Sequence, residues 1–138
     1  CSSDLLSGRP HDEILAAMQT IDVLVDQLIS GSFGLTAVEA MASGCPVICY
    51  LHDGVAVAER EACPVIEANP DTIKQVLHQL ILDRARLSDA GAAGPHYVRR
   101  NYSVEALGKH LADLYLATAD LPIPLKARVA ESARLLNS

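Results

Sequence analysis

The chain has 138 residues, of which half are apolar and only 4% aromatic, and its formal net charge is −6. This length suits one domain, or part of one, with an aliphatic core. The acidic balance, without a basic cluster, argues against nucleic acid as the main partner, because a phosphate backbone attracts gathered Lys and Arg side chains. No secretory signal is visible at the N-terminus, and no apolar run approaches the roughly 20 residues that span a bilayer.

The first expected elements are the end of a strand and a helix. Residues 1–8 could close an upstream strand, with Leu5 and Leu6 as its apolar part. A helix over residues 10–19 follows, since proline suits a first helical position and acidic residues suit the first turn. Its apolar stripe would consist of Ile14, Ala17 and Met18.

The centre of the predicted fold is a strand, a glycine loop, a helix and a second strand. Residues 21–25 and 46–50 are short apolar runs that predict buried strands. Between them lie the glycine loop, Gly31 to Gly34, and a helix over residues 35–43. Gly44 would end that helix, because glycine adopts the left-handed cap conformation without a Cβ clash. This order predicts parallel strands joined by a right-handed crossover.

The glycine loop would lie at the carboxyl ends of the strands, where open parallel sheets bind ligands. The helix behind it offers free N–H groups and the positive end of its dipole, which favour an anion such as phosphate. Glu39, about one turn into the helix, could accept hydrogen bonds from the hydroxyls of a ribose. A nucleotide diphosphate would satisfy both features. The same pattern also fits a helix packed on a sheet with Glu39 in solvent, and the residues alone leave both interpretations open.

Two polar residues, Asp26 and Gln27, directly follow the first predicted strand. At a carboxyl end they could orient the glycine loop or reach a bound sugar. Alternatively, the Asp side chain could satisfy the backbone of a local turn. The pattern does not decide between these two roles.

The remaining chain adds a third strand and more helices. Residues 64–66 predict the strand, Asn69 the cap and Pro70 the first position of a helix that runs to about residue 82. A further helix over residues 84–100 is weakened by glycines and should be kinked or interrupted at Pro95.

A helix over residues 104–118, capped by Ser103, completes the predicted domain. Prolines at positions 122 and 124 then break the chain ahead of a final helical pattern. The buried face of the helix over residues 104–118 would consist of Ala106, Leu107, Leu111, Leu114 and Tyr115.

The four cysteines have no spacing that matches a zinc site. Cys45 and Cys49 flank or lie on the second strand, where free cysteine serves as a small apolar residue. We therefore expect no metal site and a reducing, cytoplasmic location.

The segment from Gly31 to Ile48, GSFGLTAVEAMASGCPVI, resembles the donor-site signature of GT-B glycosyltransferases of the retaining family 4, or group 1, type. Residues 64–71 resemble the family's strand and turn ahead of a helix, and residues 101–115 resemble its closing helix. The resemblance extends roughly over residues 5–116. It implies an α/β fold with a Rossmann-like doubly wound parallel sheet.

In the resembled family this region is the C-terminal, donor-binding part of a two-domain protein. We expect residues 1–120 to be the C-terminal portion of the nucleotide-sugar binding domain and residues 121–138 to be a C-terminal tail or helix. Three strands are fewer than the roughly five or six of a complete domain. The sequence therefore predicts an incomplete domain and a missing N-terminal domain that binds the acceptor. Any peripheral membrane contact would belong to the missing parts.

The resemblance implies transfer of a sugar from a nucleotide-diphosphate sugar to an acceptor, with retention at the anomeric carbon and without a required metal or cofactor. Glu39 would bind the ribose. The diphosphate would contact the start of the helix, largely through backbone groups, at Ser32, Phe33, Gly34, Leu35 and Thr36. Further candidates for donor contact, each of which also suits a turn or a solvent-exposed position, are Arg9, His11, Asp26, Gly31 and His52. No residue is assigned as a catalytic acid or base, and the chain alone is expected to be inactive.

One residue departs from the family pattern. The family commonly has two glutamates separated by seven residues; Glu39 corresponds to the second, and Gly31 replaces the first. Since that first glutamate lies near the donor sugar in family members, the replacement puts direct carboxylate contact with the sugar in doubt. Two other functions stay open, a nucleotide-sugar epimerase on the same two-domain plan and a non-catalytic module that binds a nucleotide or a protein. Gly31 gives some weight to the second.

Overall fold

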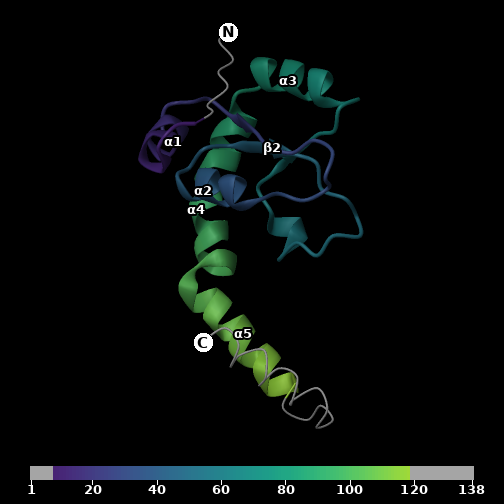
Figure 1. The fold of residues 1–138 in the computed structure, drawn as a ribbon. Coiled ribbons are helices and arrows are strands. Elements are labelled where there is room, and N and C mark those ends of the chain that lie inside the picture. Colours follow the sequence, from purple (N-terminus) through teal and green to yellow (C-terminus); the bar gives the residue numbers. More distant parts are fainter. Residues whose placement is uncertain (1–7, 119–138) are drawn as a thin grey trace. The chain divides into compact units, whose positions relative to one another are not determined.

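The computed structural model describes residues 8–118 of the chain (Figure 1). The strand expected around Leu5 and Leu6 and the tail or helix expected over residues 121–138 lie outside the described residues. The chain divides into two units, of which the first ends at Ser103 and the second begins at Val104. The first unit contains the sheet, and the described part of the second is one helix.

The sheet has three parallel strands in the order β1-β2-β3, which confirms the predicted α/β fold class. The strands are β1 (Leu24–Val25), β2 (Val47–Cys49) and β3 (Ile66–Glu67). The register pairs Leu24 with Val47 and Ile48 with Ile66. The crossover from β1 to β2 is the unit that the sequence predicted, so the glycine loop and its helix lie between neighbouring parallel strands.

The strands differ in burial from the sequence prediction. All residues of β2 are buried, as predicted. β1 is shorter than the expected strand over residues 21–25, and its Val25 side chain is 43% exposed. The prediction of a buried first strand is therefore wrong, because β1 pairs with a described neighbour on one side only.

Five α-helices lie among the described residues, and each matches a predicted helix to within a few end residues. They are α1 (His11–Met18), α2 (Leu35–Ala42), α3 (Ile73–Leu82), α4 (Ala85–Tyr102) and α5 (Val104–Thr118), and a short 3₁₀ turn, η1, covers Arg60–Ala62. α3 begins at Ile73 rather than at the predicted Pro70. Asn69 still caps the turn ahead of it, since its Oδ1 accepts N–H bonds from Asp71 and Thr72 at 3.0 Å each.

Gly44 ends α2 in the predicted left-handed conformation, with φ +78°. Its N–H donates to the carbonyl of Met41 at 3.1 Å, and the N–H of Cys45 donates to the carbonyl of Ala40 at 2.9 Å. This pair of bonds is the Schellman pattern, which satisfies carbonyls at a helix end. The chain can then turn directly into β2.

Helices cover both faces of the sheet, which is the doubly wound arrangement. Figure 1 shows α2 and α3 on opposite sides of β2. Neighbouring side chains of a strand point to opposite faces, and Val47 and Ile48 accordingly belong to two separate buried clusters. α1, α2 and the later part of α4 pack around Val47, whereas α3 and the start of α4 pack around Ile48.

α4 continues through Pro95 without a break, so the expectation of an interruption is wrong. The helix packs closely on α2: a Cβ at Gly94 would lie 2.5 Å from the carbonyl oxygen of Met41, and a Cβ at Gly91 would lie 2.7 Å from that of Gly44. The two glycines that weaken the helix in isolation therefore permit its contact with α2. Proline removes one backbone hydrogen bond from the helix. The packing against α2 compensates for that loss.

In the second unit, α5 forms as predicted but its apolar face is not buried. Leu107, Leu111, Leu114 and Tyr115 are between 46% and 67% exposed. The described part of this unit is α5 alone, so the face has no other described element of its unit to pack against. Within residues 8–118, no helix combines the length and apolar character needed to cross a bilayer.

Candidate functional site

The glycine loop lies at the carboxyl edge of the sheet, as predicted. It lies between β1 and α2 and leads directly into α2. Two backbone bonds join it to the segment that follows β2: the N–H of Tyr50 donates to the carbonyl of Gln27 at 2.9 Å, and the N–H of His52 donates to the carbonyl of Gly31 at 2.8 Å. The loop is thus held beside the ends of two neighbouring parallel strands, which is where such sheets bind ligands.

The start of α2 has the features of an anion site. Gly34, the cap residue, precedes it in an extended conformation and makes no side-chain cap bond. The N–H groups of the first helical turn have no acceptor within the helix, as at any helix start. Leu35, at the first position, is 72% exposed, and Thr36 is exposed as well. These donors therefore face solvent together with the positive end of the helix dipole.

The side chains of Asp26 and Phe33 hold the glycine loop in place. A carboxylate oxygen of Asp26 accepts the N–H of Gly34 at 3.5 Å, which supports the predicted orienting role. The half-buried ring of Phe33 meets the ring of Tyr102 edge-on, with 5.9 Å between centroids. The carbonyl of Ser32 accepts the hydroxyl of Ser30 at 3.2 Å. Because the Phe33 ring packs against the core, Phe33 would contact a ligand through its backbone groups.

Glu39 is partly shielded from solvent and has a partner. Its side chain is 25% exposed, and its Oε1 lies 3.4 Å from Nε2 of His11, the first residue of α1. The structure thus brings together two residues that the sequence offered separately as donor contacts. Arg9 behaves differently, because its guanidinium pairs with Glu13 on its own helix at 3.6 Å.

The backbone at Gly31 suits glycine and leaves little room for the glutamate common in the resembled family. Its φ is +79°, a left-handed value that glycine adopts readily. A Cβ at this position would lie 2.7 Å from the Cβ of His52, which is closer than real carbon atoms approach. A glutamate at position 31 would therefore require both an unfavourable backbone and a displaced loop after β2.

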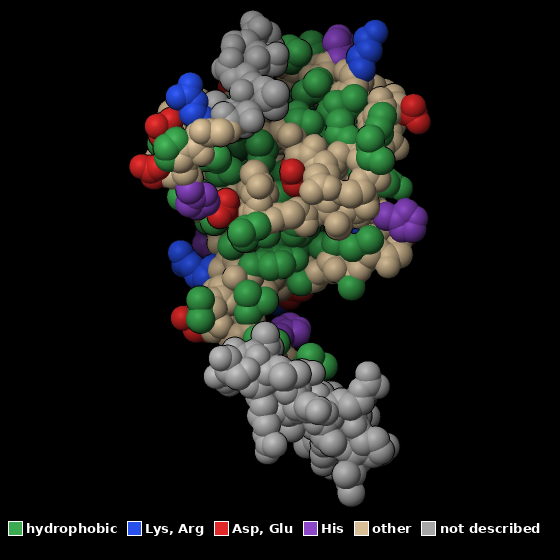
Figure 2. Space-filling view, viewed as in Figure 1, with side chains coloured by type: hydrophobic (Ala, Val, Ile, Leu, Met, Phe, Trp, Pro, Cys, Tyr) green, Lys and Arg blue, Asp and Glu red, His purple; other side chains and the backbone are tan. Residues whose placement is uncertain are grey.

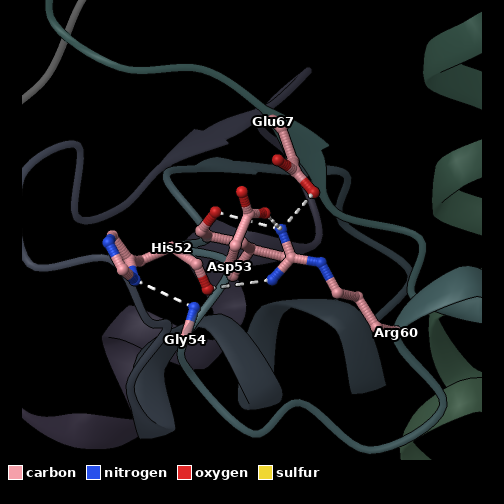
Figure 3. Close-up of polar contacts among 6 residues, drawn as sticks. His52, Asp53, Gly54, Arg60 and Glu67 are labelled. Atoms are coloured by element: carbon pink, nitrogen blue, oxygen red, sulfur yellow. Dashed lines mark hydrogen bonds and ion pairs between the residues drawn. The ribbon is translucent and has the colours of Figure 1, made fainter.

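Arg60 holds the loop that follows β2, and Figure 3 shows its guanidinium between the loop and β3. It donates to the carbonyls of Leu51 and His52 at 3.0 and 3.1 Å. It also pairs with the carboxylates of Asp53 at 3.4 Å and Glu67 at 3.2 Å. Sequence reasoning missed this residue, since a single arginine carries no spacing signal.

The imidazole of His52 points away from Arg60 in Figure 3. Its Nδ1 accepts the N–H of Gly54 at 2.9 Å, which closes the turn that follows β2. The exposed His52 side chain therefore lies on the rim of the glycine loop, next to Gly31.

Buried groups near the site are neutral. Burial raises the pKa of the Cys49 thiol to about 12, and the nearby Asp26, Cys63 and Glu67 add to the rise. Burial also raises the pKa of Tyr97, whose hydroxyl donates to the carbonyl of Ala58 at 2.6 Å. Neither group is a nucleophile or base at neutral pH. Among residues 8–118, no three His, Cys, Asp or Glu side chains gather where a metal ion could bind.

A cavity of about 320 Å³ opens elsewhere on the first unit. Asp22 and Pro46, which line it, precede β1 and β2, so the cavity lies at the amino ends of the strands and not at the glycine loop. Arg84, on its wall, pairs with Asp22 at 3.3 Å. On the face seen in Figure 2, Lys and Arg side chains lie apart from one another and form no basic patch.

Comparisons with known proteins agree with this architecture. A family model described as Glycosyl transferases group 1 matches residues 3–97. A D-inositol 3-phosphate glycosyltransferase from Corynebacterium urealyticum is 34% identical over 121 residues, covering 85% of this chain and 28% of that protein. A 2-deoxystreptamine glucosyltransferase from Streptomyces kanamyceticus is 30% identical over 111 residues, covering 78% of this chain and 28% of that protein.

The chain thus spans little more than a quarter of the length of these relatives. No solved structure gives a significant match. The family match includes all three strands, the glycine loop and α2. The chain therefore belongs to the Glycosyl transferases group 1 family.

Proposed function

We propose that this chain is the donor-binding part of a glycosyltransferase, which in the whole protein moves a sugar from a nucleotide-diphosphate sugar to an acceptor. The observation that carries the proposal is the start of α2. Its cap residue, Gly34, makes no side-chain cap bond, Leu35 and Thr36 face solvent at the carboxyl edge of the sheet, and Glu39 lies on the same helix. Membership of the family supports the class of reaction.

In this proposal the diphosphate contacts Ser32, Phe33, Gly34, Leu35 and Thr36, largely through backbone groups. Because the N–H of Gly34 donates to Asp26, Gly34 contributes a close backbone approach to the phosphates. As the bond between sugar and diphosphate breaks, negative charge grows on the leaving diphosphate. The fixed N–H groups and the helix dipole stabilise that charge, which is the electrostatic effect that usually contributes most to catalysis.

The test is isothermal titration calorimetry of the full-length protein with UDP, GDP, ADP and their sugar conjugates. We expect one base to bind clearly more tightly than the others. Absence of binding by every nucleoside diphosphate would remove the donor-site proposal and leave only an α/β fold.

Glu39 should contribute the ribose contact. Replacing it in Glu39→Ala should weaken binding of the nucleoside diphosphate by about 1–3 kcal/mol, because hydrogen bonds to a charged acceptor are lost. Glu61→Ala is the matched control, since Glu61 is exposed on η1. Unaltered affinity of the Glu39 variant in the same titration would refute the ribose assignment.

We extend the proposal to retention at the anomeric carbon, to catalysis without a required metal and to a cytoplasmic location. The first two rest on the family resemblance, and the three free cysteines among the described residues support the third. The anomeric configuration of the product and the activity in the presence of a chelator test the first two. An inverted product, or activity lost with the chelator and restored by a divalent ion, would contradict them.

The acceptor would bind outside this chain, in another part of the whole protein. D-inositol 3-phosphate is the first acceptor to assay, because several relatives, including one from Streptomyces bingchenggensis that is 33% identical, are named for it. A non-catalytic nucleotide-binding module is the second candidate, favoured by the absence of a carboxylate at Gly31. Nucleotide binding without turnover on any acceptor would support that candidate, and an epimerised nucleotide sugar would indicate the epimerase instead.

A further inference from the structure

We propose that His11 is a positioning residue of the donor site, whose imidazole holds the Glu39 carboxylate in the orientation that receives the ribose hydroxyls. The inference rests on the proposed function, because it assigns a partner to the residue that would bind the ribose. Nothing in the sequence pattern joins these two residues, which lie on different helices. The contact exists only in the folded chain.

The helices α1 and α2 bring the two side chains together. A helix that precedes a parallel strand runs antiparallel to it, so the first residue of α1 lies at the carboxyl edge of the sheet, on the same side as the start of α2. α1 is fixed there by its apolar face, since Met18 is buried in the core cluster, with Ile14 and Leu15 packed against it. His11 is thus presented by a rigid element.

The contact itself is specific. Nε2 of His11 lies 3.4 Å from Oε1 of Glu39, with the imidazole 65% exposed and the carboxylate 25% exposed. For this contact to be attractive, Nε2 must carry a proton. Arg9, the neighbouring cation, pairs with Glu13 at 3.6 Å. Of these two basic side chains, His11 is therefore the one that lies beside Glu39.

The Glu39 carboxylate can accept more hydrogen bonds than His11 alone can donate. Two carboxylate oxygens offer about four acceptor sites, and an N–H from His11 would use one of them. The remaining sites can accept the two hydroxyls of a ribose. Without His11, the carboxylate would rotate freely and would lose more conformational freedom when the ligand binds. His11 would thus strengthen ribose binding without touching the ribose.

The experiment compares ribose with deoxyribose in the full-length protein. The probes are UDP, GDP or ADP, whichever binds most tightly to the wild type, and the 2′-deoxy and 3′-deoxy forms of that nucleotide. His11→Ala should weaken binding of the ribose form by about three- to tenfold, the loss expected for one hydrogen bond. Binding of the deoxy form that lacks the hydroxyl held by Glu39 should stay within about twofold. A merely structural role would lower both affinities alike.

Two further variants complete the test. His11→Gln should restore wild-type binding, because its side-chain amide places an N–H donor close to the position of Nε2. His78→Ala is the control, since His78 is an exposed histidine on α3, and it should leave every affinity unchanged. Thermal melts of the variants verify that each is folded.

The outcomes separate this inference from the proposed function. If Glu39→Ala removes the preference for ribose while His11→Ala keeps it, the donor site stands and the role of His11 is overturned. Equal losses for ribose and deoxyribose in His11→Ala also overturn it. If no nucleoside diphosphate binds the wild type, the proposed function fails, and the inference fails with it.

Discussion

Gly31 joins the glycine loop to the loop after β2, and both its conformation and its lack of a side chain matter. We predict that Gly31→Ala lowers the free energy of unfolding by about 1–3 kcal/mol, through backbone strain at φ +79° and the 2.7 Å approach to the Cβ of His52. Gly8→Ala separates the two causes, because Gly8 also has a positive φ, +67°, but no atom lies within 4 Å of its Cβ position. Denaturant titration measures both variants, and equal losses would show that crowding by His52 contributes nothing.

Cys49 should be unreactive in the folded protein. Its pKa of about 12 keeps the thiol protonated between pH 7 and 9, and the thiolate is the reactive form. We expect iodoacetamide at pH 8 to leave Cys49 unmodified in the folded protein and to modify it after denaturation, as mass spectrometry of peptides would report. Labelling of Cys49 in the folded protein as fast as in the denatured one would contradict its burial.

The same shift makes the folded protein less stable in alkali. The pKa of Cys49 rises from its ordinary value of 9.0 to about 12 on folding. Below pH 9 the thiol is neutral in both states, so its contribution to stability is fully present. As the pH rises above 9, the unfolded chain loses this proton first, and the contribution declines.

At the residue scale, sequence predicted the roles that depend on local geometry. The left-handed Gly44 follows from the need to end a helix before a strand. For Asp26, the place at a strand end indicated an orienting role as one of two alternatives, and its contact with Gly34 favours that alternative. The pairs of His11 with Glu39 and of Arg60 with Leu51 could not be predicted, since each depends on how separate segments fold against one another. Likewise, sequence identified Gly31 as a departure from the family pattern, but only the folded structure shows how closely His52 approaches it.

At the scale of elements, α4 shows how packing overrides helix propensity. Two glycines and a proline predict a weak helix, yet α4 is continuous from Ala85 to Tyr102. Gly91 and Gly94 are buried, and α2 occupies the space beside them. The predicted interruption at Pro95 therefore does not occur, and the sequence alone does not reveal which helix faces the glycines.

Gly94 faces another helix and Gly108 faces open space, so alanine at the two positions compares the effect of close helix packing on stability. Gly94→Ala should lower the free energy of unfolding by about 1–3 kcal/mol, because its methyl group would lie 2.5 Å from the Met41 carbonyl oxygen and α4 would have to move away from α2. Gly108→Ala, on α5, meets nothing within 4 Å and should be neutral or stabilising by up to about 1 kcal/mol. Chemical denaturation followed by circular dichroism reports both, and a stabilising Gly94→Ala would show that α2 and α4 are not in close contact.

At the scale of the whole molecule, sequence reasoning identified the fold class because two signals agreed. Apolar runs marked the strands, and the glycine loop followed by a helix marked a parallel crossover. Strand ends were less predictable: apolar residues such as Ile21 continue beyond the sheet, and β3 begins at Ile66, the last residue of the run expected to form it. Pairing partners decide where a strand ends, and those partners are distant in sequence.

We predict that β2 is the most stable part of the first unit against local opening. β2 lies between the other two strands, and its side chains enter both buried clusters or are otherwise buried. Exchange of its amide hydrogens therefore requires the sheet to open, whereas the exposed residues 52–54 can exchange through local motion. Hydrogen exchange with mass spectrometry should show amides of Val47–Cys49 protected about a hundredfold or more beyond those of residues 52–54. That ratio corresponds to roughly 2.7 kcal/mol of additional opening free energy.

Similar rates in the two segments would mean that β2 is not the centre of the folded unit, and the glycine loop would then lack the rigid base on which donor binding depends.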